Sequence, residues 1–137
     1  MLTNEIRQEL IQKAAEAWGK AYAPYSKYAV GAALLTDSGR IYSGVNVENA
    51  VYPLTICAER AAVVKAVSAG ETHFSAIAVV TQNGGTPCGA CRQVLAEFGL
   101  KTIVLVANLG GELVLETTVG DLLPHAFGDA DLEAGRG

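Results

Sequence analysis

Positive charge is scarce in this chain. Ten Lys and Arg residues stand against fourteen Asp and Glu residues, which gives a net charge of −4. Nucleic-acid-binding proteins usually carry a basic patch that neutralises phosphates, whereas the basic residues here are scattered. We therefore expect no nucleic-acid partner and favour a small or neutral one. Long apolar runs are missing too, since no stretch reaches the roughly 18 residues of a membrane span, and we expect no membrane association.

Cysteine and histidine are also rare. The chain has three cysteines, which cannot pair completely with one another, and two histidines, His73 and His125, which we expect at the surface. The opening "MLTNEIRQEL" is polar and lacks the apolar region of a signal peptide, so we expect a cytoplasmic protein. In that compartment, clustered cysteines more often bind metal or take part in catalysis than form disulfides.

The pattern of apolar residues predicts one α/β domain over residues 1–127 and a polar, loose tail over residues 128–137. Periodicity and turn signals predict helices over 4–22, 57–70, 89–98 and 118–124, and strands over 28–35, 41–47, 76–80, 102–107 and 112–116. The strand, helix and strand from 76 to 107 form a βαβ unit, which pairs its strands in parallel. Together with a hairpin over 28–47, this predicts a three-layer α/β/α sandwich around a mixed sheet.

All three thiols lie in two short motifs, "TICAERAAV" and "TPCGACRQV". Each motif opens a predicted helix, and thiolates are favoured at helix N-termini by the free N–H groups and the helix dipole. Three sulfur ligands suit Zn²⁺, and a catalytic zinc site leaves its fourth position to water. We interpret Cys57, Cys88 and Cys91 as the ligands and Glu59 as a general acid/base beside that water. Arg60, three residues after Cys57, can withdraw charge from sulfur.

The pattern Cys-Ala-Glu followed by Pro-Cys-Gly-Ala-Cys resembles the small, homotetrameric cytidine deaminases that bind zinc through three cysteines. The resemblance runs from "AYAPYSKYAVGAALLT" to "LLPHAF", which is most of the chain. It implies one zinc ion per chain and hydrolytic deamination of cytidine and deoxycytidine in pyrimidine salvage. Glu59 would then move protons from the attacking water to the base and to the leaving amine.

The resemblance also implies a substrate site. Asn46 and Glu48, in "GVNVENA", match a ribose-binding Asn-x-Glu, and Ala58 is assigned to the same site. Tyr28 stands where the family usually has a phenylalanine against the pyrimidine, so its hydroxyl is a departure. Phe127, in "LLPHAF", matches an aromatic residue that enters a neighbouring subunit's site. The implied assembly is a homotetramer with sites shared between subunits.

Several alternatives remain at this point. The three cysteines could be free buried thiols, a thioredoxin-like Cys-x-x-C pair with one left over, or part of a structural zinc module, which would need a fourth ligand. Asn46 and Glu48 could instead serve turn chemistry. A deaminase of the same fold could act on a base, a nucleotide, a nucleic acid or a nucleoside antibiotic.

Overall fold

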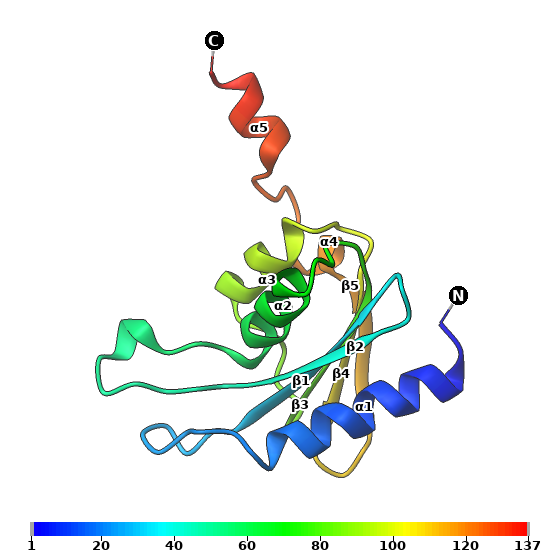
Figure 1. Ribbon diagram of the computed structural model, residues 1–137, viewed down its shortest axis with the longest axis vertical. Coiled ribbons are helices and arrows are strands. Elements are labelled where there is room, and N and C mark those ends of the chain that lie inside the picture. The colour runs from blue at the N-terminus through cyan, green and yellow to red at the C-terminus, as the bar shows by residue number, and fades with distance from the viewer. Residues whose placement is uncertain (1, 137) are drawn as a thin grey trace.

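The computed structural model describes residues 2–136 and has a mixed five-stranded sheet between two layers of helices (Figure 1). Helix α1 covers one face, and α2 and α3 cover the other. The elements are α1 (Asn4–Trp18), β1 (Val30–Thr36), β2 (Ile41–Val45), η1 (Tyr52–Leu54), α2 (Ala58–Ser68), β3 (Phe74–Thr81), α3 (Gly89–Ala96), β4 (Ile103–Asn108), β5 (Leu113–Thr118), α4 (Val119–Leu122) and α5 (Asp129–Ala134). The predicted three-layer fold is confirmed.

The strands lie in the order β2-β1-β3-β4-β5. Only β3 and β4 run parallel, with α3 between them in the chain, and the other neighbours pair antiparallel. The predicted βαβ unit and hairpin are therefore both present. In the βαβ unit, the chain leaves the C-terminal end of β3 and enters α3, so the first turn of α3 lies at that end of the sheet.

The central strands bury side chains on both faces because successive residues of a strand point in opposite directions. On β3, Ile77 and Val79 belong to the core under α2 and α3, whereas Ala76, Ala78 and Val80 belong to the core under α1. Residues 76–80 of the strand are all apolar because both faces are covered there, as the uniformly apolar sequence predicted.

Two glycines let the helices approach the sheet closely. A Cβ at Gly31 of β1 would lie 2.0 Å from the carbonyl oxygen of Ala14 in α1. A Cβ at Gly44 of β2 would lie 2.4 Å from the carbonyl oxygen of Ala58, in the first turn of α2. Real side chains do not tolerate such distances. Gly44 therefore fixes how deeply the first turn of α2, which follows Cys57, sits against the sheet.

Besides shifts of one or two residues at most element ends and the unpredicted η1, the structure differs from the predicted elements at two places. Helix α1 ends at Trp18 rather than at Tyr22, because Tyr22 instead pairs with the segment after β2, its N–H donating to the carbonyl of Asn46 at 3.0 Å. The tail is not loose throughout, because residues 129–134 form α5, which buries no residue. The N–H of Gly128 donates to the Asp131 carboxylate at 2.9 Å and so supports the helix start.

Both histidines are exposed. No helix within residues 2–136 is long and apolar enough to cross a membrane.

Candidate active site

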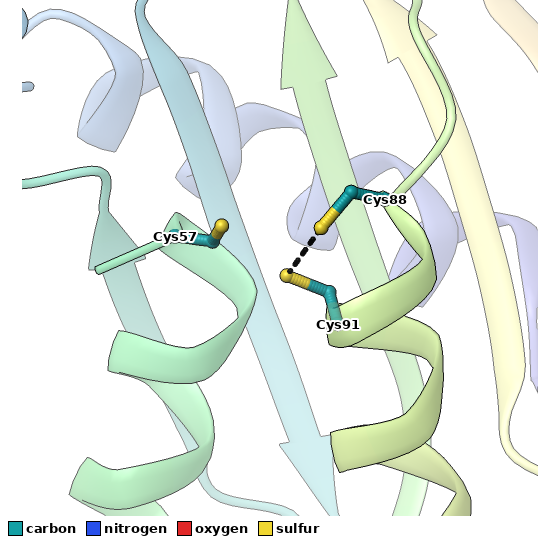
Figure 2. A group of neighbouring side chains, drawn as sticks. All are labelled: Cys57, Cys88 and Cys91. Carbon is teal, nitrogen blue, oxygen red and sulfur yellow. Dashed lines mark hydrogen bonds between the residues drawn. The ribbon is translucent and has the colours of Figure 1, made fainter. Parts of the chain in front are cut away.

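The three thiols meet where α2 and α3 begin (Figure 2). Cys57 and Cys88 are the N-cap residues of these helices, and Cys91 lies in the first turn of α3. The three Sγ atoms all lie within 4.8 Å of one another, and the Cys88 thiol donates to Cys91 Sγ at 3.5 Å. The predicted ligand set is thus brought together by two helix starts. Three converging sulfur atoms of this kind fit a zinc ion.

The thiols differ in their surroundings. Cys88 is exposed, Cys57 is half-buried and Cys91 is completely buried. The Cys91 thiol, followed by the Arg60 guanidinium, lowers the pKa of Cys57 to about 5, while the bond to Cys57 and burial raise the pKa of Cys91. The cluster therefore holds one negative charge readily, and a cation would be needed to hold three thiolates together.

Arg60 faces the cluster from the first turn of α2. Its Nη2 donates to Cys57 Sγ at 3.3 Å and to the carbonyl oxygen of Thr55 at 3.4 Å. Its Nε is buried and has no hydrogen-bond partner among the described residues. A cation held against sulfur in this way draws charge from the thiolate, as the sequence predicted for Arg60.

Glu59 lies beside the thiols with only 4% of its surface exposed. Burial is the main cause that raises the pKa of its carboxyl to about 6, and the charge of Cys57 adds to the effect. A carboxyl with a pKa near neutrality can both accept and donate a proton at working pH. The geometry therefore suits the general acid/base role predicted for it.

A cavity of about 260 Å³ opens at this point. Its lining includes four predicted site residues besides Tyr28, namely Asn46, Cys57, Glu59 and Cys88. The other lining residues are Ser26, Val30, Thr55, Val79, Thr81, Gly85 and Thr86. The cavity thus brings a carboxyl, two thiols and an aromatic ring into the lining of one space.

Asn46 contributes to this cavity but is also bonded to the backbone. Its Oδ1 accepts from the N–H of Val30 and its Nδ2 donates to the carbonyl of Tyr28, both at 2.9 Å. The residue is 7% exposed. In this structure the Asn46 side chain therefore fixes the chain between Tyr28 and Val30 through long-range bonds rather than through a local turn. One of its amide N–H groups has no hydrogen-bond partner within residues 2–136.

Glu48 lies on a neighbouring cavity of about 370 Å³, which shares Ser26 and Thr55 with the first. Its carboxylate accepts from the N–H groups of Tyr25 at 2.8 Å and Ser26 at 3.0 Å, and also from the Ser26 hydroxyl. The bond from Ser26 is the main cause that lowers the pKa of Glu48. Glu48 is therefore an ionised anchor of the 25–26 turn, adjacent to the cavity that holds Glu59.

The remaining predicted residues lie outside the cavity lining. Ala58 is fully buried in the first turn of α2. Phe127 is 60% exposed, and its carbonyl accepts from Gln93 Nε2 at 2.9 Å. Sequence reasoning missed the wall formed by Thr81, Gly85 and Thr86. These residues lie in "TQNGGTP", where only a turn signal is visible in the sequence.

Comparison with known proteins agrees with this geometry. Residues 4–107 match the family model described as the cytidine and deoxycytidylate deaminase zinc-binding region. The chain belongs to the cytidine deaminase family. The predicted enzyme class is therefore confirmed. The matched family model describes a zinc-binding region, which agrees with the three converging thiols.

The enzyme is similar over most of its length to proteins of several organisms. It is 52% identical to the cytidine deaminase of Sporosarcina psychrophila, with 91% of this chain and 93% of that protein covered. A crystal structure of cytidine deaminase from Burkholderia pseudomallei superposes with a TM-score of 0.84 at 48% identity, with 91% of this chain and 99% of that chain covered. A blasticidin-S deaminase of Bacillus cereus is 33% identical, with 87% of this chain and 90% of that protein covered.

Proposed function

We propose that this cytidine deaminase hydrolyses both cytidine and deoxycytidine, giving uridine or deoxyuridine and ammonia, and that it serves pyrimidine salvage in the cytoplasm. The observation that carries the proposal is the cavity shared by Tyr28, Asn46, Glu59 and two of the three thiols. In this cavity the base would lie beside the Glu59 carboxyl and the sugar would lie toward Asn46.

Cys57, Cys88 and Cys91 would hold one zinc ion per chain. Zinc supplies the electrophilic character that makes a water molecule acidic near pH 7. The Glu59 carboxyl would take the proton of the attacking water and deliver it to N3 of the base. The new bond forms between the water oxygen and C4. Glu59 would then take the second proton, from the hydroxyl now on C4, and pass it to the exocyclic nitrogen. The bond from C4 to that nitrogen would break as the C4 carbonyl forms, so the nitrogen would leave as ammonia.

The sugar would be recognised beside the free amide N–H of Asn46, with Ala58 behind the base and Glu48 at the neighbouring turn. Glu48 carries a negative charge next to the sugar end, so a 3′-phosphate would be repelled. Binding energy from the sugar would help to position C4 for attack. Free cytosine lacks this contribution and should react poorly.

A substrate panel tests this proposal. Ammonia release is recorded with cytidine, deoxycytidine, cytosine, CMP, adenosine and blasticidin S. We expect turnover of both of the first two and little of the others. Equal rates with cytosine and cytidine would contradict the role of the sugar site. Preferential turnover of blasticidin S would move the assignment to the antibiotic-acting relatives.

We also propose that residues 1–127 form the catalytic domain, followed by a polar tail, and that four chains assemble with dihedral symmetry. Two observations support the assembly. The segment between β2 and α2, which extends from the body in Figure 1, exposes several apolar side chains: Val47, Val51, Tyr52, Leu54 and Ile56. The cavity, at about 260 Å³, is smaller than the roughly 300–1,000 Å³ of complete ligand pockets, which fits a site completed by a neighbour's Phe127.

Light scattering should give the mass of four chains, and a fully active monomer would refute the shared site. Phe127→Ala should weaken substrate binding with zinc content unchanged. Mixing and reassembling Phe127→Ala with Glu59→Gln gives hybrids in which one subunit's Glu59 meets another's Phe127. Activity well above the sum of the two parents would support sharing, and strict additivity would count against it.

A further inference from the structure

The hydroxyl of Tyr28 is hydrogen-bonded to the loop after β3, a loop that also contributes to the cavity lining. Tyr28 precedes β1 and lines the cavity with 41% of its surface exposed. Its hydroxyl donates to Asn83 Oδ1 at 2.7 Å, across 55 residues of sequence. Asn83 lies in the loop after β3 that leads to Cys88. The bond therefore joins the aromatic wall of the cavity to the loop that delivers a zinc ligand.

Asn83 Oδ1 accepts a second hydrogen bond that continues along the cavity wall. The Thr81 hydroxyl donates to it at 3.3 Å and itself accepts from the N–H of Gly85 at 2.8 Å. Thr81, at the end of β3, is almost fully buried, and both Thr81 and Gly85 line the cavity. Asn83 Oδ1 thus accepts from two residues that line the cavity, Tyr28 and Thr81, as an amide oxygen with two lone pairs can.

The main chain of Tyr28 is held independently. Its N–H donates to Ser26 Oγ at 3.0 Å, and its carbonyl accepts from Asn46 Nδ2 at 2.9 Å. Asn83 adds a third fixed point at the far end of the ring. A side chain held at its backbone and at its tip keeps one orientation without a bound ligand, which lowers the ordering cost on binding.

Gly85 leaves just enough room for this arrangement. A Cβ at residue 85 would lie 2.7 Å from the Tyr28 hydroxyl oxygen, while the next nearest atoms, in Asn83 and Thr81, are 3.8 Å away. An added methyl group would therefore meet the Tyr28 hydroxyl and little else. This makes Gly85 a position from which the ring can be displaced deliberately.

We propose that Asn83 is a positioning residue for the deamination reaction: through the Tyr28 hydroxyl it holds the aromatic ring in place as the wall against which the pyrimidine packs. The inference rests on the proposed function, because it places a nucleoside base in this cavity. Asn83 acts through Tyr28 and has no hydrogen bond to Glu59 or the thiols within residues 2–136. Its loss should therefore weaken substrate binding and leave the chemical step unchanged.

The first experiment is a double-mutant cycle on cytidine deamination with Tyr28→Phe, Asn83→Ala and the combination. Each single variant should raise KM about two- to tenfold, the range of one neutral hydrogen bond, with kcat and zinc content unchanged. The combination should raise KM no more than the larger single effect, because both changes break the same bond. Gln82→Ala is the matched control, since Gln82 is the exposed amide next in the chain and lies outside the cavity lining.

The second experiment uses steric displacement and its relief. Gly85→Ala should raise KM because the new methyl group pushes the Tyr28 hydroxyl away. Adding Tyr28→Phe removes the atom that the methyl group meets, so the double variant should return to the KM of Tyr28→Phe alone. A general defect of the 82–87 loop would not be relieved by a change at Tyr28.

Binding of uridine, measured as a Kd by calorimetry, gives a readout that does not depend on turnover. Failure of the wild-type enzyme to release ammonia from cytidine would count against the proposed function, while the uridine Kd still tests Asn83. Parallel increases in KM and Kd in both single variants, with relief of Gly85→Ala by Tyr28→Phe, support the inference. Unchanged KM and Kd in Asn83→Ala, or a loss of zinc and kcat in its place, overturn it.

Discussion

The cavity has two walls that are built in different ways. One wall comes from the starts of α2 and α3, where Cys57, Glu59 and Cys88 take their positions from residues only a few places away in the chain. The other comes from loops, where Tyr28 and Asn46 are held by hydrogen bonds across 16 to 55 residues. The groups that react with the substrate are thus placed by local helix geometry, whereas those that surround it depend on tertiary contacts.

Removing a thiol should break the helix wall with the largest effect. In Cys91→Ala we expect zinc content to fall from about one per chain to near zero, since a buried sulfur ligand cannot be replaced by water. Activity should fall roughly a thousandfold or more, because a catalytic metal supplies several kcal/mol of transition-state stabilisation. Elemental analysis and ammonia release measure the two effects. Full zinc content in this variant would show that the metal is bound elsewhere.

Glu59→Gln should remove the proton transfer while leaving the helix wall intact. The two side chains have nearly the same shape, so we expect the fold and zinc content to be retained. Activity should fall about 10²–10⁴-fold, the usual contribution of a general acid/base. Glu97→Gln, which changes an exposed carboxyl just after α3, is the control and should stay near wild-type activity. Near-normal turnover in Glu59→Gln would show that Glu59 is not the general acid/base.

Asn46→Ala should disturb the loop wall and lower stability. The change leaves the N–H of Val30 and the carbonyl of Tyr28 without their partner at a partly buried position, which costs about 1–3 kcal/mol. Denaturant unfolding should show this loss, together with a raised KM and unchanged zinc content. Asn4→Ala, at an exposed asparagine that starts α1, is the comparison and should change stability little. Equal stability of the two variants would mean that the Asn46 bonds do not hold the wall.

The smallest effect is expected at Glu71, which follows the C-terminal end of α2 and lies far from the cavity. Glu71 accepts from Ser38 and from the Tyr42 hydroxyl at 2.6 Å, and these bonds, that from Ser38 foremost, lower its pKa from 4.5 to about 2. Its contribution to stability is therefore complete above the unfolded pKa near 4.5 and is lost as the pH falls toward 2.

Melting temperatures of wild type and Glu71→Gln, recorded from neutral pH downward, check this point. The difference between them should be largest at neutral pH and vanish near pH 2. A difference that does not change with pH would mean that the charge on Glu71 is not what joins the hairpin to α2.

The same contrast between local and long-range contacts explains which parts of the fold and site could be predicted from the sequence. The three-layer fold and the cluster of Cys57, Cys88 and Cys91 followed from local periodicity and spacing, and the structure confirms both. The bond between Tyr28 and Asn83 could not be foreseen, because a turn sequence such as "TQNGG" does not show which distant side chain its amide will meet. The departure from phenylalanine at Tyr28 was the only signal in the sequence. Helix α5 was missed because a short polar helix with no buried residue leaves no apolar pattern.

The close contact between α1 and the sheet has a consequence for studies of sequence variation. Beneath α1 the sheet presents Gly31, where a Cβ would lie 2.0 Å from the carbonyl oxygen of Ala14. It also presents four fully buried alanines, Ala33, Ala76, Ala78 and Ala107. A larger side chain at these positions would have to displace closely packed neighbours. A saturation scan of all positions should therefore show a stripe of intolerant sites here, on the face of the sheet opposite the thiols. Such a stripe would resemble a second conserved motif in an alignment, although it would record only the spacing between a helix and the strands below it.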